Sequence, residues 1–101
     1  MPSKVPLIGI TLGGRGVPMK TLLSLAQEAE EAGIYAIGVG EAALDTFSLL
    51  SAIAAVTSRI RLVSSTATWT RTPVTTARAV RTLDGISNGR YSLGLGSMPP
   101  Q

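Results

Sequence analysis

The sequence IYAIGV at residues 34–39 is an unbroken apolar run with the length of one β-strand. Runs of this kind are typical of strands in parallel sheets, where both faces of the strand are covered. Before it, apolar residues in the range 19–29 recur at helical spacing, and Gly33 is placed to end that helix. After it, Asp45 can cap a second helix that extends to Ser58. The run is therefore predicted to be a strand between two helices of an α/β fold.

The same alternation of strand and helix extends to both ends of the chain. Further strands are predicted at residues 5–12 (VPLIGITL), 60–67 (IRLVSSTA) and 91–95 (YSLGL). Thr72 and Pro73 form a suitable cap and first turn for a third helix, which residues 88–89 (Asn-Gly) end. The order β-α-β-α-β-α-β, in units of about thirty residues, indicates parallel strands with right-handed crossovers. On this pattern alone, both a doubly wound sheet and the first half of a (β/α)8 TIM-type barrel remain open.

The composition is that of a chain that buries much of itself. Of its 101 residues, 45% are hydrophobic and 15% are charged, so one small domain with a core is expected rather than disorder. The sequence has no cysteine and no histidine. A disulfide framework, a thiolate nucleophile and a histidine base are therefore excluded, and no metal site of the usual zinc ligands is expected.

The net charge is +3, and the later basic residues include Arg71, Arg78, Arg81 and Arg90. Such a basic stretch can bind an anion, but it is more often the solvated face of a helix. The sequence contains no basic cluster rich in aromatic residues, so a nucleic-acid partner is not expected. The polar opening Met-Pro-Ser-Lys does not resemble a secretory signal, and the apolar runs at 34–39 and 49–56 are too short to span a membrane. A cytoplasmic protein is expected, in keeping with its lack of cysteine.

Three phrases between Glu30 and Gly96 resemble the luciferase-like monooxygenase family, which comprises bacterial luciferase-like, flavin- or deazaflavin-dependent oxidoreductases. AEEAGIYAIGVGE resembles that family's second-strand phrase, and SLLSAIAAVTSRIRLVSS resembles its passage from helix to third strand. RTPVTTARAVRTLDGISNGRYSLGLGS resembles the stretch that ends with "GRFxLGLG" at the fourth strand. The Thr70–Pro73 loop and the Ser-Met-Pro ending are most similar to the deazaflavin (coenzyme F420) branch, while an FMN enzyme also remains open.

The resemblance implies a (β/α)8 barrel in which a reduced deazaflavin (coenzyme F420) or FMN transfers hydride or activates oxygen on a small-molecule substrate. A complete barrel takes about 250 residues. We therefore expect residues 1–101 to be a single partial barrel domain, truncated after the fourth strand and inactive alone. The family often places a histidine after the second-strand glutamate, but here Ala42 and Ala43 follow Glu41. No catalytic residue is assigned for this reason.

In a parallel barrel the chemistry lies at the C-terminal ends of the strands. Glu41 ends the second strand, where its carboxylate can hold a cofactor ring or a neighbouring loop, or can form a structural salt bridge. Gly96 and Ser97 follow the fourth strand and are included among the predicted cofactor contacts. The Gly13–Gly16 turn lacks the Gly-Lys-Ser/Thr of a phosphate loop, so a tight turn is expected there.

The end of the third strand is the most informative stretch, because it changes from apolar residues to hydroxyls that can serve a ring of the isoalloxazine type. Its predicted cofactor contacts are Ser64, Ser65, Thr66 and Thr68. By resemblance to the family, a non-proline cis peptide with a bulge is expected within residues 64–66. Trp69 can line the cofactor pocket and Arg71 can bind a phosphate or carboxylate. The alternatives are a tryptophan in the core and a solvated arginine.

Two functions remain open on the sequence. One is an oxidoreductase barrel, represented by its N-terminal part. The other is a non-catalytic half-barrel that acts as a binding or assembly module through homodimerisation or a partner chain. The strands at 5–12 and 91–95 each have an unpaired edge, and the inner faces of the four strands are expected to expose Ile, Leu and Val. A homo-oligomer, or association with the missing half of the barrel, is therefore predicted.

Overall fold

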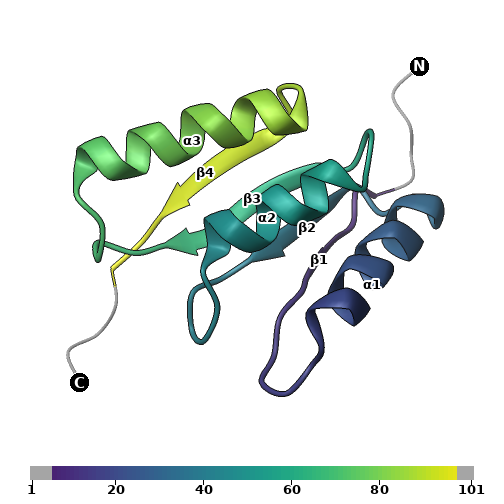
Figure 1. Cartoon of the computed structure of the whole chain (residues 1–101). Coiled ribbons are helices and arrows are strands. Elements are labelled where there is room, and N and C mark those ends of the chain that lie inside the picture. The colour runs from purple at the N-terminus through teal and green to yellow at the C-terminus, as the bar shows by residue number, and fades with distance from the viewer. Residues whose placement is uncertain (1–5, 98–101) are drawn as a thin grey trace.

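A computed structural model describes residues 6–97 of the chain as a parallel four-stranded sheet with helices between successive strands (Figure 1). The elements are β1 (Gly9–Thr11), α1 (Met19–Glu31), β2 (Ala36–Val39), α2 (Thr46–Ala55), β3 (Arg61–Ala67), α3 (Pro73–Ser87) and β4 (Tyr91–Leu95). The strand order is β1-β2-β3-β4, and every neighbouring pair is parallel. This order confirms the predicted α/β fold and the predicted succession of strand-helix units.

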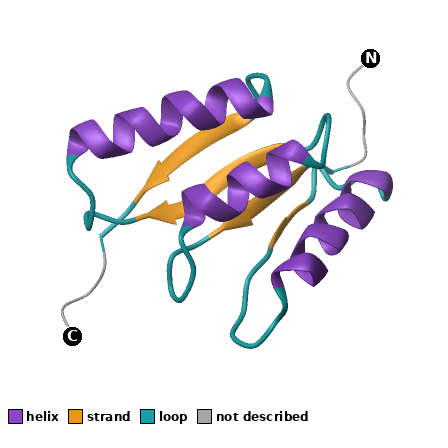
Figure 2. Ribbon diagram, in the orientation of Figure 1, coloured by secondary structure: helices purple, strands orange, loops and turns teal. Residues whose placement is uncertain are grey.

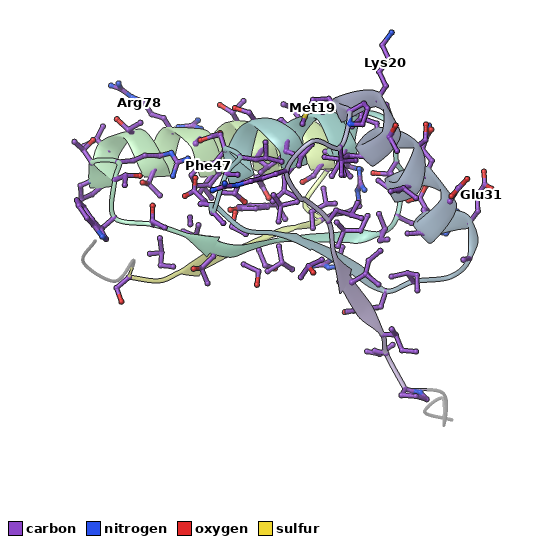
Figure 3. All side chains as sticks on the ribbon, turned by 90° about the horizontal axis from the view of Figure 1, so that it is seen from below. Met19, Lys20, Glu31, Phe47 and Arg78 are labelled. Atoms are coloured by element: carbon purple, nitrogen blue, oxygen red, sulfur yellow. The ribbon has the colours of Figure 1, made fainter. Side chains whose placement is uncertain are left out.

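All three helices lie on one face of the sheet (Figures 2 and 3). Across the strands, Ile10 is in register with Ile37, Ile37 with Leu62, and Leu62 with Tyr91. Neighbours in register point to the same face, and this row packs against the helix layer. From the helices, Leu22, Ala26, Leu50, Ile53 and Leu83 complete the core and are at most 1% exposed. The sheet and its helices therefore form two layers around one apolar core.

The opposite face of the sheet carries small and hydroxyl side chains, and no described helix or strand covers it. Thr11, Ser65, Thr66 and Ser92 are exposed. A Cβ placed on Gly38 would lie 3.3 Å from the Ser65 side chain, so the two residues share this face. The prediction of an open face rich in Ile, Leu and Val is wrong, because strand alternation places most of those side chains under the helices and leaves Val63 on the open face.

The helix starts confirm the predicted caps. The Asp45 carboxylate accepts a 2.8 Å hydrogen bond from the Ser48 N–H at the start of α2. At the start of α3, the Thr72 hydroxyl accepts one of 3.2 Å from the Thr75 N–H. Asn88 ends α3 in a left-handed conformation with φ 55°. Side-chain caps of this kind satisfy N–H groups that have no partner within the helix.

Two boundaries differ from the prediction. Within the described residues β1 begins at Gly9, not at residue 5, which lies outside them; β1 pairs only with the short β2. Helix α2 ends at Ala55 and not at Ser58. There the Glu30 carboxylate accepts hydrogen bonds from the backbone N–H groups of residues 58–60, at 2.9, 2.8 and 3.0 Å. These N–H groups therefore bind α1 instead of extending α2.

The late arginines have different environments. Arg78 is exposed on α3 and points away from the sheet (Figure 3), as a solvated helix face predicts. Arg90 is only 8% exposed, so the same prediction is wrong for it. Its guanidinium donates to backbone carbonyl oxygens of Ala54, Thr57, Ile60 and Ser87, at 2.7 to 3.1 Å. Arg90 thereby satisfies carbonyl groups at the ends of α2 and α3, which the helices themselves leave without partners, together with the carbonyl group of Ile60.

Across residues 6–97, no helix is long and apolar enough to cross a membrane.

Candidate functional site

The C-terminal ends of the four parallel strands lie along one edge of the sheet (Figure 1). This edge contains every residue predicted to contact a cofactor, since those residues lie in or just beyond the C-terminal ends of β2, β3 and β4. It comprises Glu41 after β2, the segment Ser64–Arg71 at the end of β3 and beyond, and Gly96 and Ser97 after β4. We call this edge the rim.

The end of β3 has the irregular backbone that the family resemblance predicts. The peptide bond between Ser65 and Thr66 is cis, and the register of β3 with β4 shifts between Ser64 and Ala67. Ser65 and Thr66 are exposed on the open face, whereas Ser64 is 1% exposed. The hydroxyls of the strand end are therefore divided between the open face and the core.

Ser64 belongs to a buried network of three hydroxyl groups. The Ser64 hydroxyl lies 2.5 Å from the Tyr91 hydroxyl and 3.1 Å from the Thr46 hydroxyl. Thr46 donates its one proton to the Val39 carbonyl oxygen at 2.7 Å, which leaves its oxygen free to accept from Ser64. Burial raises the pKa of the Tyr91 phenol. Thr46 and Tyr91 were not identified from the sequence as members of this network. The available signal was the tyrosine at position 91, where the family phrase has phenylalanine, because it adds a hydroxyl that needs a partner.

Glu41 binds the loop that follows β3, as one of its sequence interpretations predicted. Its Oε1 atom accepts a 2.9 Å hydrogen bond from the Thr68 N–H, and both of its carboxylate oxygens pair with the Arg71 guanidinium, at 2.6 and 2.5 Å. The Glu41 side chain is only 8% exposed. The hydrogen bonds from Arg71 lower the pKa of Glu41, with a smaller contribution from the Thr68 N–H against the opposing effect of burial. The carboxylate is therefore ionised and bound at both oxygens.

Arg71 is mostly buried and bound to two carboxylates, so it is not the solvated arginine that was one of the alternatives. Its guanidinium also pairs with the Asp45 carboxylate and lies over the Phe47 ring, 4.6 Å from the ring centroid. Asp45 thus has a second role beyond capping α2. The hydrogen bonds that Arg71 donates to Glu41 raise the pKa of Arg71, so its positive charge is fixed. The residues Glu41, Asp45, Phe47 and Arg71, which come from three segments of the chain, form what we call the rim cluster.

Trp69 is 69% exposed, so its interpretation as a core tryptophan is wrong. It is one of the residues that line an apolar groove of about 840 Å³ between α3 and β4, on the helix side of the sheet. The groove is lined mainly by Ala77, Val80, Tyr91, Leu93 and Leu95. Because β4 is the last strand of the described sheet, this groove lies along a free edge.

Glycines bring β4 close to the irregular part of β3. A Cβ on Gly94 would overlap the backbone carbonyl oxygen of Ser64, and a Cβ on Gly96 would collide with the Thr66 hydroxyl. The Gly96 N–H donates to the Ala67 carbonyl oxygen at 2.9 Å. Ser97 is exposed beyond it. Both glycines are therefore explained by close strand packing, and they leave the backbone uncovered on the open face.

The turn after β1 is tight, as predicted, with positive φ angles at Gly14 and Gly16. A second cavity, of about 350 Å³, separates this turn from residues 42–44. Among the described residues, no group of three or more acidic side chains is placed to hold a metal ion.

Comparisons with known proteins agree with this geometry. A sequence model of the family described as luciferase-like monooxygenase matches residues 7–101. The pyrimidine monooxygenase RutA of Pseudomonas syringae pv. syringae (strain B728a) is 48% identical over 52 residues, which are 52% of this chain and 14% of RutA. RutA of Rhizobium rhizogenes (strain K84 / ATCC BAA-868) is also 48% identical over 52 residues.

Two solved structures have the same arrangement of strands and helices. The monooxygenase RslO1 from Streptomyces bottropensis superposes with a TM-score of 0.78 at 28% identity, over 90% of this chain and 33% of its own. The coenzyme F420 dependent tetrahydromethanopterin reductase from Methanopyrus kandleri superposes with a TM-score of 0.80 at 29% identity, over 89% of this chain and 26% of its own. This chain thus spans about a third or less of each of these proteins.

Proposed function

Because this chain belongs to the luciferase-like monooxygenase family, we propose that it supplies the first four strands of a barrel oxidoreductase whose rim binds a reduced deazaflavin (coenzyme F420) or FMN. The bound cofactor would supply hydride, or the electrons that activate oxygen, to a small-molecule substrate. The observation that carries this proposal is the end of β3. There, exposed hydroxyls lie beside a backbone that glycines leave uncovered.

The residues at this position fit a planar ring. Ser65 and Thr66 each offer a hydroxyl that can donate or accept a hydrogen bond. On either side of them, Gly40 and Gly94 have no side chain, and a Cβ on Gly40 would lie only 3.0 Å from the Ser65 carbonyl oxygen. A ring system can therefore approach the backbone of β2 to β4 more closely than side chains elsewhere in a sheet would allow. Ser97, beyond β4, can provide a further hydroxyl at the same edge.

The other predicted contacts have indirect roles in this proposal. Ser64 orders the strand end from within the core, because its hydroxyl already binds Thr46 and Tyr91. Glu41 and Arg71 bind each other, so a cofactor phosphate would be bound elsewhere in the barrel. Both deazaflavin and FMN fit the hydroxyls of β3. The similarity to an F420-dependent reductase and the Thr70–Pro73 loop favour testing the deazaflavin first.

Fluorescence of Trp69, which is the only tryptophan, tests the proposal. We expect its emission to be quenched on titration with coenzyme F420 or FMN, after correction for light absorption with free tryptophan. Replacing Ser65 with Ala and Thr66 with Val should weaken the quenching several-fold, while Ser92→Ala, on the same face but nearer the start of β4, should not. Unchanged emission with both cofactors at high micromolar concentration would contradict the proposal.

A second candidate function is assembly without chemistry, and the free edge of β4 favours it. Leu93 and Leu95 are 37% and 66% exposed beside the apolar groove. Exposed apolar edges of this kind promote pairing with another chain. The chain would then form a homodimer or bind a separate half-barrel. Sedimentation over a wide concentration range distinguishes the two outcomes, because a single species at monomer mass would exclude homodimerisation.

A further inference from the structure

We propose that Glu41 and Arg71 form a positioning pair that sets the conformation of the loop Thr68–Arg71, and that Arg71 is not an anion ligand. The inference rests on the proposed function only in assuming that this loop contributes to cofactor binding.

One carboxylate holds both ends of this loop. The Oε1 atom of Glu41 accepts from the backbone N–H of Thr68, the first residue of the loop, at 2.9 Å, and from the side chain of Arg71, the last, at 2.6 Å. Within the loop, the hydroxyls of Thr68 and Thr70 lie 3.0 Å apart. Because both ends bind the same group, the intervening Trp69 is held in place without being buried.

Arg71 has no donor geometry left for a bidentate contact with a phosphate. Both terminal nitrogens of its guanidinium pair with Glu41, one of them also binds Asp45, and its plane lies over Phe47. Two carboxylates against one guanidinium give this corner a formal charge of about −1, so an incoming anion meets repulsion there. Binding a phosphate would require Arg71 to leave a nearly buried carboxylate unpaired, which is strongly unfavourable.

The Glu41–Arg71 pair determines the position of Trp69, because the Trp69 side chain has little packing of its own to hold it. Trp69 is 69% exposed, whereas Thr68 beside it is 9% exposed. A side chain with few packing contacts takes its direction from its backbone, and here the backbone is fixed by Glu41. A change in the pair should therefore alter the environment of Trp69 directly, even where the sheet and helices are unchanged.

The test compares E41Q, R71K and the double variant, with R78K as the control on the exposed face of α3. E41Q leaves Arg71 paired with Asp45, and R71K keeps the charge, so both should fold; circular dichroism checks this. We expect acrylamide to quench Trp69 more strongly and its anisotropy to fall in both single variants. The double variant should show no further change, because the two residues act as one unit. R78K should match the parent protein.

Two titrations separate positioning from anion binding. With coenzyme F420 or FMN, E41Q and R71K should each weaken binding by roughly tenfold, within the usual range for residues of one hydrogen-bonded network. With inorganic phosphate, the midpoint of thermal unfolding should not depend on Arg71. If phosphate raises the unfolding midpoint of the parent protein and R71K removes that rise, Arg71 is an anion ligand and the inference is overturned.

The outcomes also separate this inference from the proposed function. If neither cofactor binds the parent protein but Trp69 responds to E41Q and R71K as described, the proposed function fails and the positioning pair stands. If the cofactor binds and Trp69 is equally accessible to acrylamide in all variants, the proposed function stands and the positioning pair is wrong.

Discussion

At the two ends of β3, a glutamate from elsewhere in the chain binds the backbone, but the two glutamates have different partners. At the start of β3, Glu30 of α1 accepts from three successive N–H groups, at residues 58–60. At the end of β3, Glu41 accepts from one N–H group, at Thr68, and from the guanidinium of Arg71. The first carboxylate is bound mainly by backbone, and the second mainly by a side chain.

This difference separates stability from loop conformation. In strand-helix barrels the N-terminal ends of the strands serve stability, and the C-terminal ends carry the chemistry. Around the start of β3, Glu30 binds N–H groups and Arg90 binds carbonyl groups, so both kinds of unpaired backbone group are satisfied. Around the end of β3, the rim cluster connects side chains whose replacement should change the conformation of the loop Thr68–Arg71. We therefore expect changes at the start of β3 to lower stability and changes at its end to affect Trp69.

The largest loss of stability is expected from Arg90→Met. The variant keeps much of the apolar stem but leaves the carbonyl groups of Ala54, Thr57 and Ile60 without their donor. Hydrogen bonds to a charged donor contribute about 1.5–3 kcal/mol each, and losing a buried group that makes several costs on the order of 3 kcal/mol in total. Urea unfolding measures this loss. A change below about 1 kcal/mol would show that Arg90 is not a main support of this end of the sheet.

A smaller loss is expected from Gly94→Ala, which tests the close contact of β4 with β3. The new Cβ would overlap the Ser64 carbonyl oxygen, so the strands must separate, at a cost of about 1–3 kcal/mol. Gly85→Ala is the matched control, since a Cβ there meets nothing within 4 Å and α3 should gain up to about 1 kcal/mol. Thermal unfolding of both variants measures the contrast. Equal stability of the two would contradict the described packing of β4.

The smallest effect is the pH dependence that Glu30 contributes. Burial acts to raise its pKa, but the N–H groups of residues 58–60 together lower the pKa from 4.5 to about 2. A lowered pKa means that the stabilisation is fully present above about pH 4.5 and is lost as the pH falls toward 2. The parent protein should therefore lose more stability than Glu30→Gln between these pH values. Parallel curves of unfolding free energy against pH would contradict the assigned contacts.

Much of the fold was predictable because its signals are local. Apolar periodicity located every strand and helix, and the caps Asp45 and Thr72 were recognisable from residue type alone. The end of α2 was not, because it depends on Glu30, which lies 28 to 30 residues away from the N–H groups that it binds. The small-residue face was available from the sequence, since Leu62 and Ser64 must share one face of β3 while Val63 and Ser65 share the other.

The site was less predictable, because its contacts join distant segments. The cis bond and the bulge came from resemblance to the family, and no property of Ser65 or Thr66 alone indicates them. For Glu41 the salt bridge was one of several interpretations, and only the fold identifies Arg71, 30 residues later, as its partner. Trp69 was ambiguous because exposure of a tryptophan depends on the loop that carries it.

We expect a flavin-type cofactor to bind at the C-terminal end of β3 and not at its start. Backbone amide chemical shifts, followed during titration with coenzyme F420 and then with FMN, locate the binding residue by residue. The shifts should cluster at Ser65, Thr66 and residues 94–97, while residues 58–60 and Arg90 should be unchanged. Shifts confined to the start of β3, or no shifts with either cofactor at high micromolar concentration, would contradict this expectation.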